Sequence, residues 1–192
     1  MRDTGRAFLG YFYFDFRDDE KQNNRNFVTS LLTQLAASSE PCCDIIFSLY
    51  STHGNGAQQP SIDVLTDYLH EMLFTIAARQ PIYIIVDALD ECPKMSGMPS
   101  PRVAVLNLLA DLVDRHDPNL HICVSSCPEI DVRTVLEPLA CGVVLLHDES
   151  GQQKDICNYV SDFVHSDKNT RRWRDSDKKL VVEELSKKAD GR

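Results

Sequence analysis

Residues 81–91 read Pro-Ile-Tyr-Ile-Ile-Val-Asp-Ala-Leu-Asp-Glu, and this stretch decides the fold. The run Ile82–Val86 consists entirely of β-prone apolar residues, so both faces of a strand formed here would be apolar. Such strands are typical of the centre of a parallel sheet, where helices cover each side. The sequence therefore predicts a central parallel strand that is covered by helices on both faces.

Acidic residues follow this run directly. Asp87 ends it, and Asp90 and Glu91 come immediately after the short link Ala88-Leu89. Ligands of open α/β sheets bind outside the carboxyl ends of the strands. The pattern has the form of a Walker B element, in which the first Asp holds Mg²⁺ and a following acid orients the attacking water. On this interpretation Asp87 is the metal and cofactor residue, and Asp90 and Glu91 are catalytic. The alternative is a buried strand whose exit turn is merely solvated by acids.

The composition fits one soluble globular domain with a sizeable core. The chain has 192 residues, of which 43% are hydrophobic and 26% are charged. A net charge of −9 argues against binding to a nucleic-acid backbone, which normally requires a basic face. The basic cluster at 171–174 (Arg-Arg-Trp-Arg) is interpreted as a solvated loop or helix start rather than an RNA site. We therefore expect no nucleic-acid partner.

The chain also shows no sign of a membrane segment or a secretory leader. No apolar stretch approaches the roughly 20 residues that a membrane-spanning helix needs, and the first residues are polar, unlike a signal peptide. The seven cysteines are an odd number without the spacing of a disulfide scaffold, which favours the reducing cytosol. We expect a cytoplasmic protein without a membrane partner.

A zinc site is a weaker interpretation of some of these cysteines. His116, His121, Cys123 and Cys127 lie close together in the sequence, but no C-x-x-C spacing is present. Core thiols and a loop histidine explain the same residues better.

Strands alternate with helices along the rest of the chain. Besides the central strand, the pattern predicts strands at 11–16, 120–126 and 143–146. Helices are expected at 23–37, 42–50, 61–78, 100–116, 131–136, 150–163 and 175–189. Ser61 and Ser100 are expected N-caps, and Pro101 suits the first helical position. This alternation predicts a parallel α/β sheet.

Several segments together resemble the NACHT NTPase module of the STAND class of signal-transduction ATPases. The resemblance rests on Asp87–Pro93 (Asp-Ala-Leu-Asp-Glu-Cys-Pro), Phe14–Asp18, and 125–133 (Ser-Ser-Cys-Pro-Glu-Ile-Asp-Val-Arg). It is closest to the fungal NLR-like, nephrocystin-3-like N-terminal subgroup, whose members often carry ankyrin or WD repeats downstream. The resemblance implies a parallel three-layer P-loop NTPase sheet, with ATP and Mg²⁺ as cofactors. It also implies a partial NTPase core over 1–165 and the start of a following helical segment over 166–192.

The chain departs from this family in three places. The phosphate-binding loop G-x-x-x-x-G-K-[ST] has no counterpart, and no Gly-Lys pair occurs anywhere in the sequence. We therefore expect the chain to begin after that loop, to lack the family's first strand, and to expose apolar sheet edges. Cys127 occupies a sensor position where the family usually has Arg, and a thiol cannot replace a guanidinium. The chain ends near residue 192, about where the family continues into a winged-helix segment.

These observations lead to three functional hypotheses. The favoured one is a piece of a NACHT-type switch that keeps the acidic residues but binds ATP weakly or not at all by itself. The alternative is a pseudo-NTPase interaction module with protein partners, docking on intact relatives or self-associating through its exposed sheet edges. The third is a Mg²⁺-dependent hydrolase that uses Asp87, Asp90 and Glu91 without a nucleotide.

Overall fold

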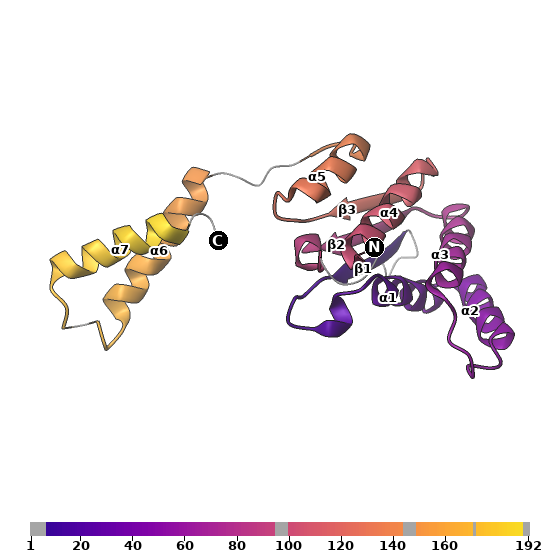
Figure 1. Ribbon diagram of the computed structural model, residues 1–192. Coiled ribbons are helices and arrows are strands. Elements are labelled where there is room, and N and C mark those ends of the chain that lie inside the picture. The colour runs from indigo at the N-terminus through magenta and orange to yellow at the C-terminus, as the bar shows by residue number, and fades with distance from the viewer. Residues whose placement is uncertain (1–6, 95–99, 144–148, 171, 190–192) are drawn as a thin grey trace. The chain divides into compact units, whose positions relative to one another are not determined.

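The computed structural model describes residues 7–94, 100–143, 149–170 and 172–189. The chain forms two compact units, Met1–Cys141 and Gly142–Arg192. The first unit is α/β with a parallel sheet, and the second is a pair of helices (Figure 1). The expected end of the NTPase core at residue 165 stays a prediction about the family's module.

In the first unit, helical segments connect three described strands. The elements in chain order are β1 (Phe8–Tyr13), η2 (Asp19–Lys21), α1 (Asn24–Ala36), α2 (Glu40–Thr52), α3 (Ile62–Ala77), β2 (Ile82–Asp87), η3 (Leu89–Glu91), α4 (Pro101–Asp114), β3 (Leu120–Val124), α5 (Ile130–Leu136) and η4 (Glu137–Leu139). The strands form one parallel sheet in the order β1-β2-β3. This confirms the predicted α/β class and is consistent with part of a P-loop-like fold.

The first strand lies earlier in the sequence than predicted. It spans Phe8–Tyr13 rather than 11–16. The carboxylate of Asp15 accepts hydrogen bonds from the backbone N–H of Arg17 (2.9 Å) and from its guanidinium (3.0 Å), which turns the chain out of the sheet. Gly10 lies inside this strand. The Phe8 ring packs against it so closely that a Cβ at position 10 would lie 2.9 Å from the ring.

The predicted helix starts are largely confirmed. The side chains of Asn23, Ser61 and Ser100 each accept a hydrogen bond from a backbone N–H in the first turn of α1, α3 and α4. Pro41 lies within the first turn of α2 rather than ahead of the helix. The predicted strand at 143–146 lies outside the described residues except for Val143, which is not in a strand.

The helices of the first unit cover one face of the sheet. Along β2, buried residues alternate with exposed ones. The buried side chains pack with α1, α3 and α4 into one core that includes Phe8, Phe12, Ile82, Ile84 and Val86. The order β1-β2-β3 advances in a single direction, so right-handed crossovers place every connecting helix on the same side. The prediction that helices cover β2 on both faces is therefore wrong for the described residues.

The other face of the sheet, which we call the open face, is apolar and exposed. Its side chains include Tyr11 (49% exposed), Tyr13 (46%), Tyr83 (37%) and Ile85 (42%), together with His121 and Cys123 of β3. The rings of Tyr83 and His121 stack at 4.8 Å. Parallel sheets are normally covered on both faces, so an exposed apolar face is an unusual feature of this unit.

A side chain caps the outer edge of β1. At the outer edge of β1, the side-chain amide of Gln34 on α1 accepts a hydrogen bond from the Tyr11 N–H (3.1 Å) and donates one to the Tyr11 carbonyl (2.8 Å). A side chain thereby occupies the backbone positions that another strand would use.

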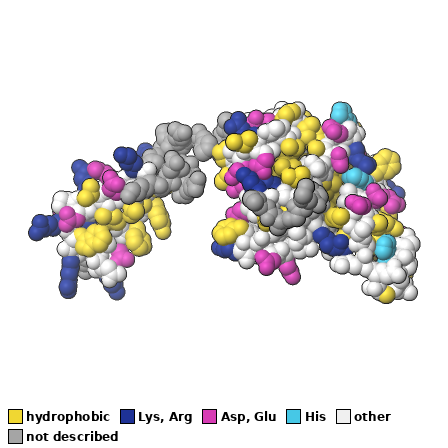
Figure 2. Space-filling view, in the orientation of Figure 1, with side chains coloured by type: hydrophobic (Ala, Val, Ile, Leu, Met, Phe, Trp, Pro, Cys, Tyr) yellow, Lys and Arg dark blue, Asp and Glu magenta, His cyan; other side chains and the backbone are white. Residues whose placement is uncertain are grey.

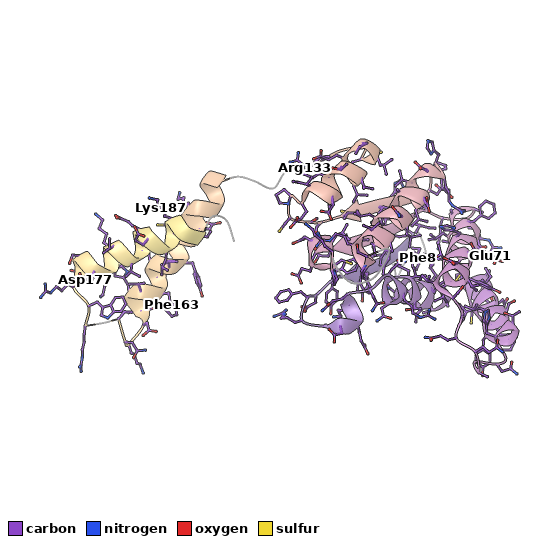
Figure 3. All side chains as sticks on the ribbon, viewed as in Figure 1. Phe8, Glu71, Arg133, Phe163, Asp177 and Lys187 are labelled. Carbon is purple, nitrogen blue, oxygen red and sulfur yellow. The ribbon has the colours of Figure 1, made fainter. Side chains whose placement is uncertain are left out.

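The second unit is a helical hairpin of α6 (Glu149–Ser166) and α7 (Asp175–Ala189), close to the predicted helices. The hydroxyl of buried Thr170 donates to the Val164 carbonyl (2.6 Å) and so fixes the end of α6. Hydrophobic side chains remain on its surface (Figure 2), among them Phe163, which Figure 3 labels on α6. No helix in the described part of the chain is both long and apolar enough to cross a bilayer.

Candidate functional site

The predicted site residues lie where the strands of the sheet end. Asp87 is the last residue of β2, and its exposed side chain belongs to the open face. Its Oδ1 accepts hydrogen bonds from the Ser125 hydroxyl and from the Ala88 N–H (3.0 Å). Within the described part of the chain, Oδ2 accepts no hydrogen bond. The protein thus fixes one oxygen of this carboxylate, while the other has no hydrogen-bond donor among the described residues.

Ala88 holds this carboxylate at the start of a sharp turn. Its φ of 53° lies in the left-handed region, which is uncommon for a residue other than glycine. The turn lets η3 begin at once, so that Asp90 and Glu91 stay near the strand ends instead of following the line of β2. Such backbone strain is frequent at functional turns.

Asp90 ties the end of β2 to the end of β3. Its Oδ1 accepts a hydrogen bond from the Cys127 N–H (2.9 Å). Burial opposes ionisation of this carboxyl, but the hydrogen bonds from Cys127 and the charge of Arg102 outweigh it, and the pKa of Asp90 is lowered. Asp90 is therefore an ionised anchor for the exit of β3.

Glu91 makes the corresponding connection to the other neighbour. Its Oε2 accepts a hydrogen bond from the Phe16 N–H (3.0 Å), just beyond β1. The structure thus brings Asp87, Asp90 and Glu91 to one end of the sheet, where Asp87 and Asp90 bond to the exit of β3 and Glu91 bonds to the exit of β1.

Arg102 is a site residue that sequence reasoning missed. It lies in the first turn of α4 and is 4% exposed. Its guanidinium donates to the Cys92 carbonyl (2.8 Å) and to the Asp90 carbonyl, and lies 3.5 Å from the carboxylate of Asp131. A cation near a helix N-terminus is opposed by the helix dipole, so these contacts must compensate for it.

An ion-pair network extends from Arg102 toward α5. Lys94 lies 3.6 Å from Asp131 and donates to Glu129 at 2.5 Å. Burial disfavours the charge of Asp131, but Arg102 and Lys94 together lower the pKa of Asp131. The network fixes the segment after β3 relative to the acidic turn.

One buried thiol, Cys92, and one exposed thiol, Cys127, also lie at the site. Burial raises the pKa of the Cys92 thiol to about 11, so it is protonated near neutral pH. Cys127 is exposed, and its backbone belongs to the site through Asp90. Its predicted place as the family's sensor position stays a prediction.

The donor set fits one magnesium contact but no protein-made metal cage. Among the described residues, no group of three His, Cys, Asp or Glu side chains converges on one point. Nucleotide-bound Mg²⁺ commonly takes only one or two carboxylates, with the phosphates and water as its other ligands. Asp87, with one oxygen held by Ser125 and Ala88, suits that role, in which the ion would neutralise phosphate charge.

A comparison with known protein families assigns the chain to one of them. The family model described as nephrocystin 3, N-terminal, matches residues 1–127, which is well over half of the sequence. The chain belongs to the nephrocystin 3 N-terminal family. No curated protein and no solved structure matched it.

The nephrocystin 3 N-terminal match covers all three described strands and the acidic turn. Asp87, Asp90, Glu91, Arg102 and Ser125 lie inside it. Glu129, Asp131 and the whole second unit lie beyond it. The family assignment therefore concerns the sheet and its strand ends.

Proposed function

We propose that this chain forms the acidic half of a NACHT-type nucleotide switch, with Asp87 as the carboxylate on the Mg²⁺ side. The observation that carries the proposal is the position of Asp87. It ends the central parallel strand, with one oxygen immobilised by Ser125 and the other not hydrogen-bonded in the described part of the chain. That combination is what a ligand site outside the carboxyl end of a sheet requires.

The geometry favours a transmitting role for the other two acids. Asp90 holds Cys127 and Glu91 holds Phe16, so a shift of Asp87 toward a ligand would be passed to the exits of β3 and β1. Among the described residues, the three acids do not form a group that could hold a metal ion together. The hypothesis of a Mg²⁺-dependent hydrolase built from these three acids receives no support from this arrangement.

The chain's own contribution to nucleotide affinity is small in this proposal. The sequence contains no G-x-x-x-x-G-K-[ST] cradle, and the residues present do not fit a triphosphate by themselves. We expect little or no binding of Mg-ATP by the chain alone. We also propose a cytoplasmic location, which the odd number of cysteines without the spacing of a disulfide scaffold favours.

The test is isothermal titration with Mg-ATP, on the chain alone and on the chain joined to an upstream segment that contains the phosphate loop. We expect binding only in the joined protein, with loss of at least about tenfold in affinity in Asp87→Asn. Asp44→Asn, which removes an exposed carboxylate on α2, is the control. Failure of the joined, folded protein to bind nucleotide would overturn the proposal.

A second candidate function is a protein-interaction module, which the open face favours. An exposed apolar surface of this kind marks a site of association. The test is co-expression with a tagged family member that has an intact phosphate loop, followed by purification and measurement of the oligomeric state. A chain that stays monomeric and does not co-purify would contradict this function.

A further inference from the structure

A hollow of about 470 Å³, which we call the amino-end pocket, lies between the last turns of α3 and α4 and the segment that enters β3. It is therefore at the end of the sheet opposite to the acidic turn. Its walls are mostly apolar, with contributions from Leu73, Ala77, Leu112, Pro118 and Leu120. Small-molecule sites have this size and this largely apolar lining, together with a few polar groups that orient the ligand.

Hydrogen bonds hold the walls of the amino-end pocket in place. The Asn119 side chain donates to the Ala77 carbonyl at the end of α3 (2.7 Å), and the Asn119 N–H donates to the Asp117 carboxylate (2.9 Å). The His116 ring donates from Nδ1 to the Asp114 carbonyl (2.7 Å), at a turn where the φ of His116 is 53°. The pocket is thus preformed, which lowers the entropic cost of binding a ligand.

Arg115 supplies the permanent positive charge of this pocket. Its guanidinium donates to Nδ1 of His70 at 2.6 Å. No carboxylate of the described residues forms an ion pair with Arg115. Asp117, which also lines the pocket, accepts the Asn119 N–H instead. A guanidinium has five N–H donors in a fork that matches a carboxylate, so donors remain for the acidic group of a ligand.

The imidazole of His70 holds this guanidinium in position. Because a guanidinium can only donate, Nδ1 of His70 accepts, and Nε2 carries the proton of the neutral ring. Burial and the charge of Arg115 lower the pKa of His70 against the opposing charges of Asp67 and Asp111, which favours that neutral form. Nε2 is buried and has no hydrogen-bond partner among the described residues. An unsatisfied buried donor is destabilising, so a support for Arg115 accounts for a histidine at this position.

We propose that the amino-end pocket binds a small monocarboxylate with an apolar body, of the class of medium-chain fatty acids. The carboxylate pairs with Arg115, and the apolar body lies against Leu73, Leu112 and Leu120. His70 is a positioning residue, because it acts through the guanidinium. None of these residues belongs to the proposed nucleotide site, so this binding site goes beyond the proposed function.

The probe is octanoate, titrated into the full chain without nucleotide and followed by the NMR shifts of the backbone N–H groups. We expect saturable shifts at His116 and Leu120 and none at Asp87. Arg115→Gln, a change at an exposed side chain, should weaken binding at least about tenfold. Arg79→Gln removes the same charge from an exposed residue that does not line the pocket, and should leave binding unchanged. Octanol, which has the same chain without the charge, should bind at least about tenfold more weakly than octanoate.

His70→Leu separates a positioning role from a structural one. It removes the unsatisfied N–H, so the Tm should stay the same or rise, while octanoate binding weakens. His70→Gln, whose side-chain carbonyl can accept from Arg115, should restore binding. No saturable shifts, shifts confined to other residues, equal binding of octanol, full binding to Arg115→Gln, or a His70→Leu chain that loses stability but keeps its affinity would each overturn the proposal. Because no nucleotide is present, these outcomes are independent of the Mg-ATP titration.

Discussion

Ile84 and Ile85 are neighbours of the same residue type in the same strand, yet they belong to different environments. Ile84 is 1% exposed in the core beneath α1, α3 and α4, whereas Ile85 is 42% exposed on the open face. Both faces of the run Ile82–Val86 are apolar, but in the described part of the chain only one of them has helices over it. The comparison teaches that the composition of a strand indicates the environment it suits, while the direction of the crossovers decides which face is covered within a given unit.

The largest expected difference in stability comes from replacing each of these two isoleucines in turn. Ile84→Ala should lower the free energy of unfolding by about 3 kcal/mol, because it leaves a cavity in a packed core. Ile85→Ala should lower it by less than about 1 kcal/mol, since its side chain is already partly in water. Urea unfolding of both variants measures the difference. Equal losses would show that the open face is covered in the folded protein.

A second comparison concerns two charged residues at the carboxyl edge of the sheet, Arg102 on the covered side and Asp87 on the open side. Arg102→Met should cost about 3 kcal/mol, because the Asp90 and Cys92 carbonyls lose a buried donor and Asp131 keeps only Lys94 of its two cationic partners. Asp87→Asn should cost about 1 kcal/mol or less, since its side chain is exposed. Thermal unfolding of the two variants provides the measurement. A larger loss from Asp87→Asn would make that residue structural.

Gln34 tests the difference between the two edges. Gln34→Ala removes both side-chain hydrogen bonds to Tyr11 and should destabilise the chain by about 1 kcal/mol. It should also increase self-association, because the edge of β1 is then open to pairing. Light scattering over a concentration series follows this, with Thr33→Ala as the control on the same helix. Unchanged association would mean that α1 itself shields the edge.

The smallest expected effect is on how the stability of the folded chain depends on pH under acidic conditions. The pKa of Asp90 in the folded chain lies below its ordinary value of 3.8, so its stabilising contribution is complete above that pH. It is lost as the pH falls through the lowered folded value. Asp90→Asn should therefore show a shallower loss of stability than the native chain below about pH 4. Parallel profiles would mean that the contact with Cys127 is not maintained in solution.

Much of the fold was predictable because its signals are local. Ser61 and Ser100 precede apolar periodic stretches and cap the helices as expected. The run Ile82–Val86 forms the central strand, and Asp87 lies at its tip. Each prediction depends on backbone chemistry within a few residues, which a single sequence contains.

The features that escaped prediction depend on distant residues. Arg102 is an ordinary surface residue type, and only the fold brings it to the carbonyls of Asp90 and Cys92. The divergence of Asp90 and Glu91 likewise follows from partners that lie beyond the ends of other strands, Cys127 after β3 and Phe16 after β1. The one sign of the role of Arg102 in the sequence was its place in the first turn of an expected helix, where the helix dipole disfavours a cation.

The amide of Gln34 also limits the stoichiometry of any assembly built through this sheet. With the middle of β1 occupied by Gln34, the described part of the sheet has one edge left for a further strand, at β3. Addition of one partner strand there leaves no second edge for growth among the described strands. Two-edged sheets can propagate into open-ended fibres, whereas this one is built to stop after a single addition.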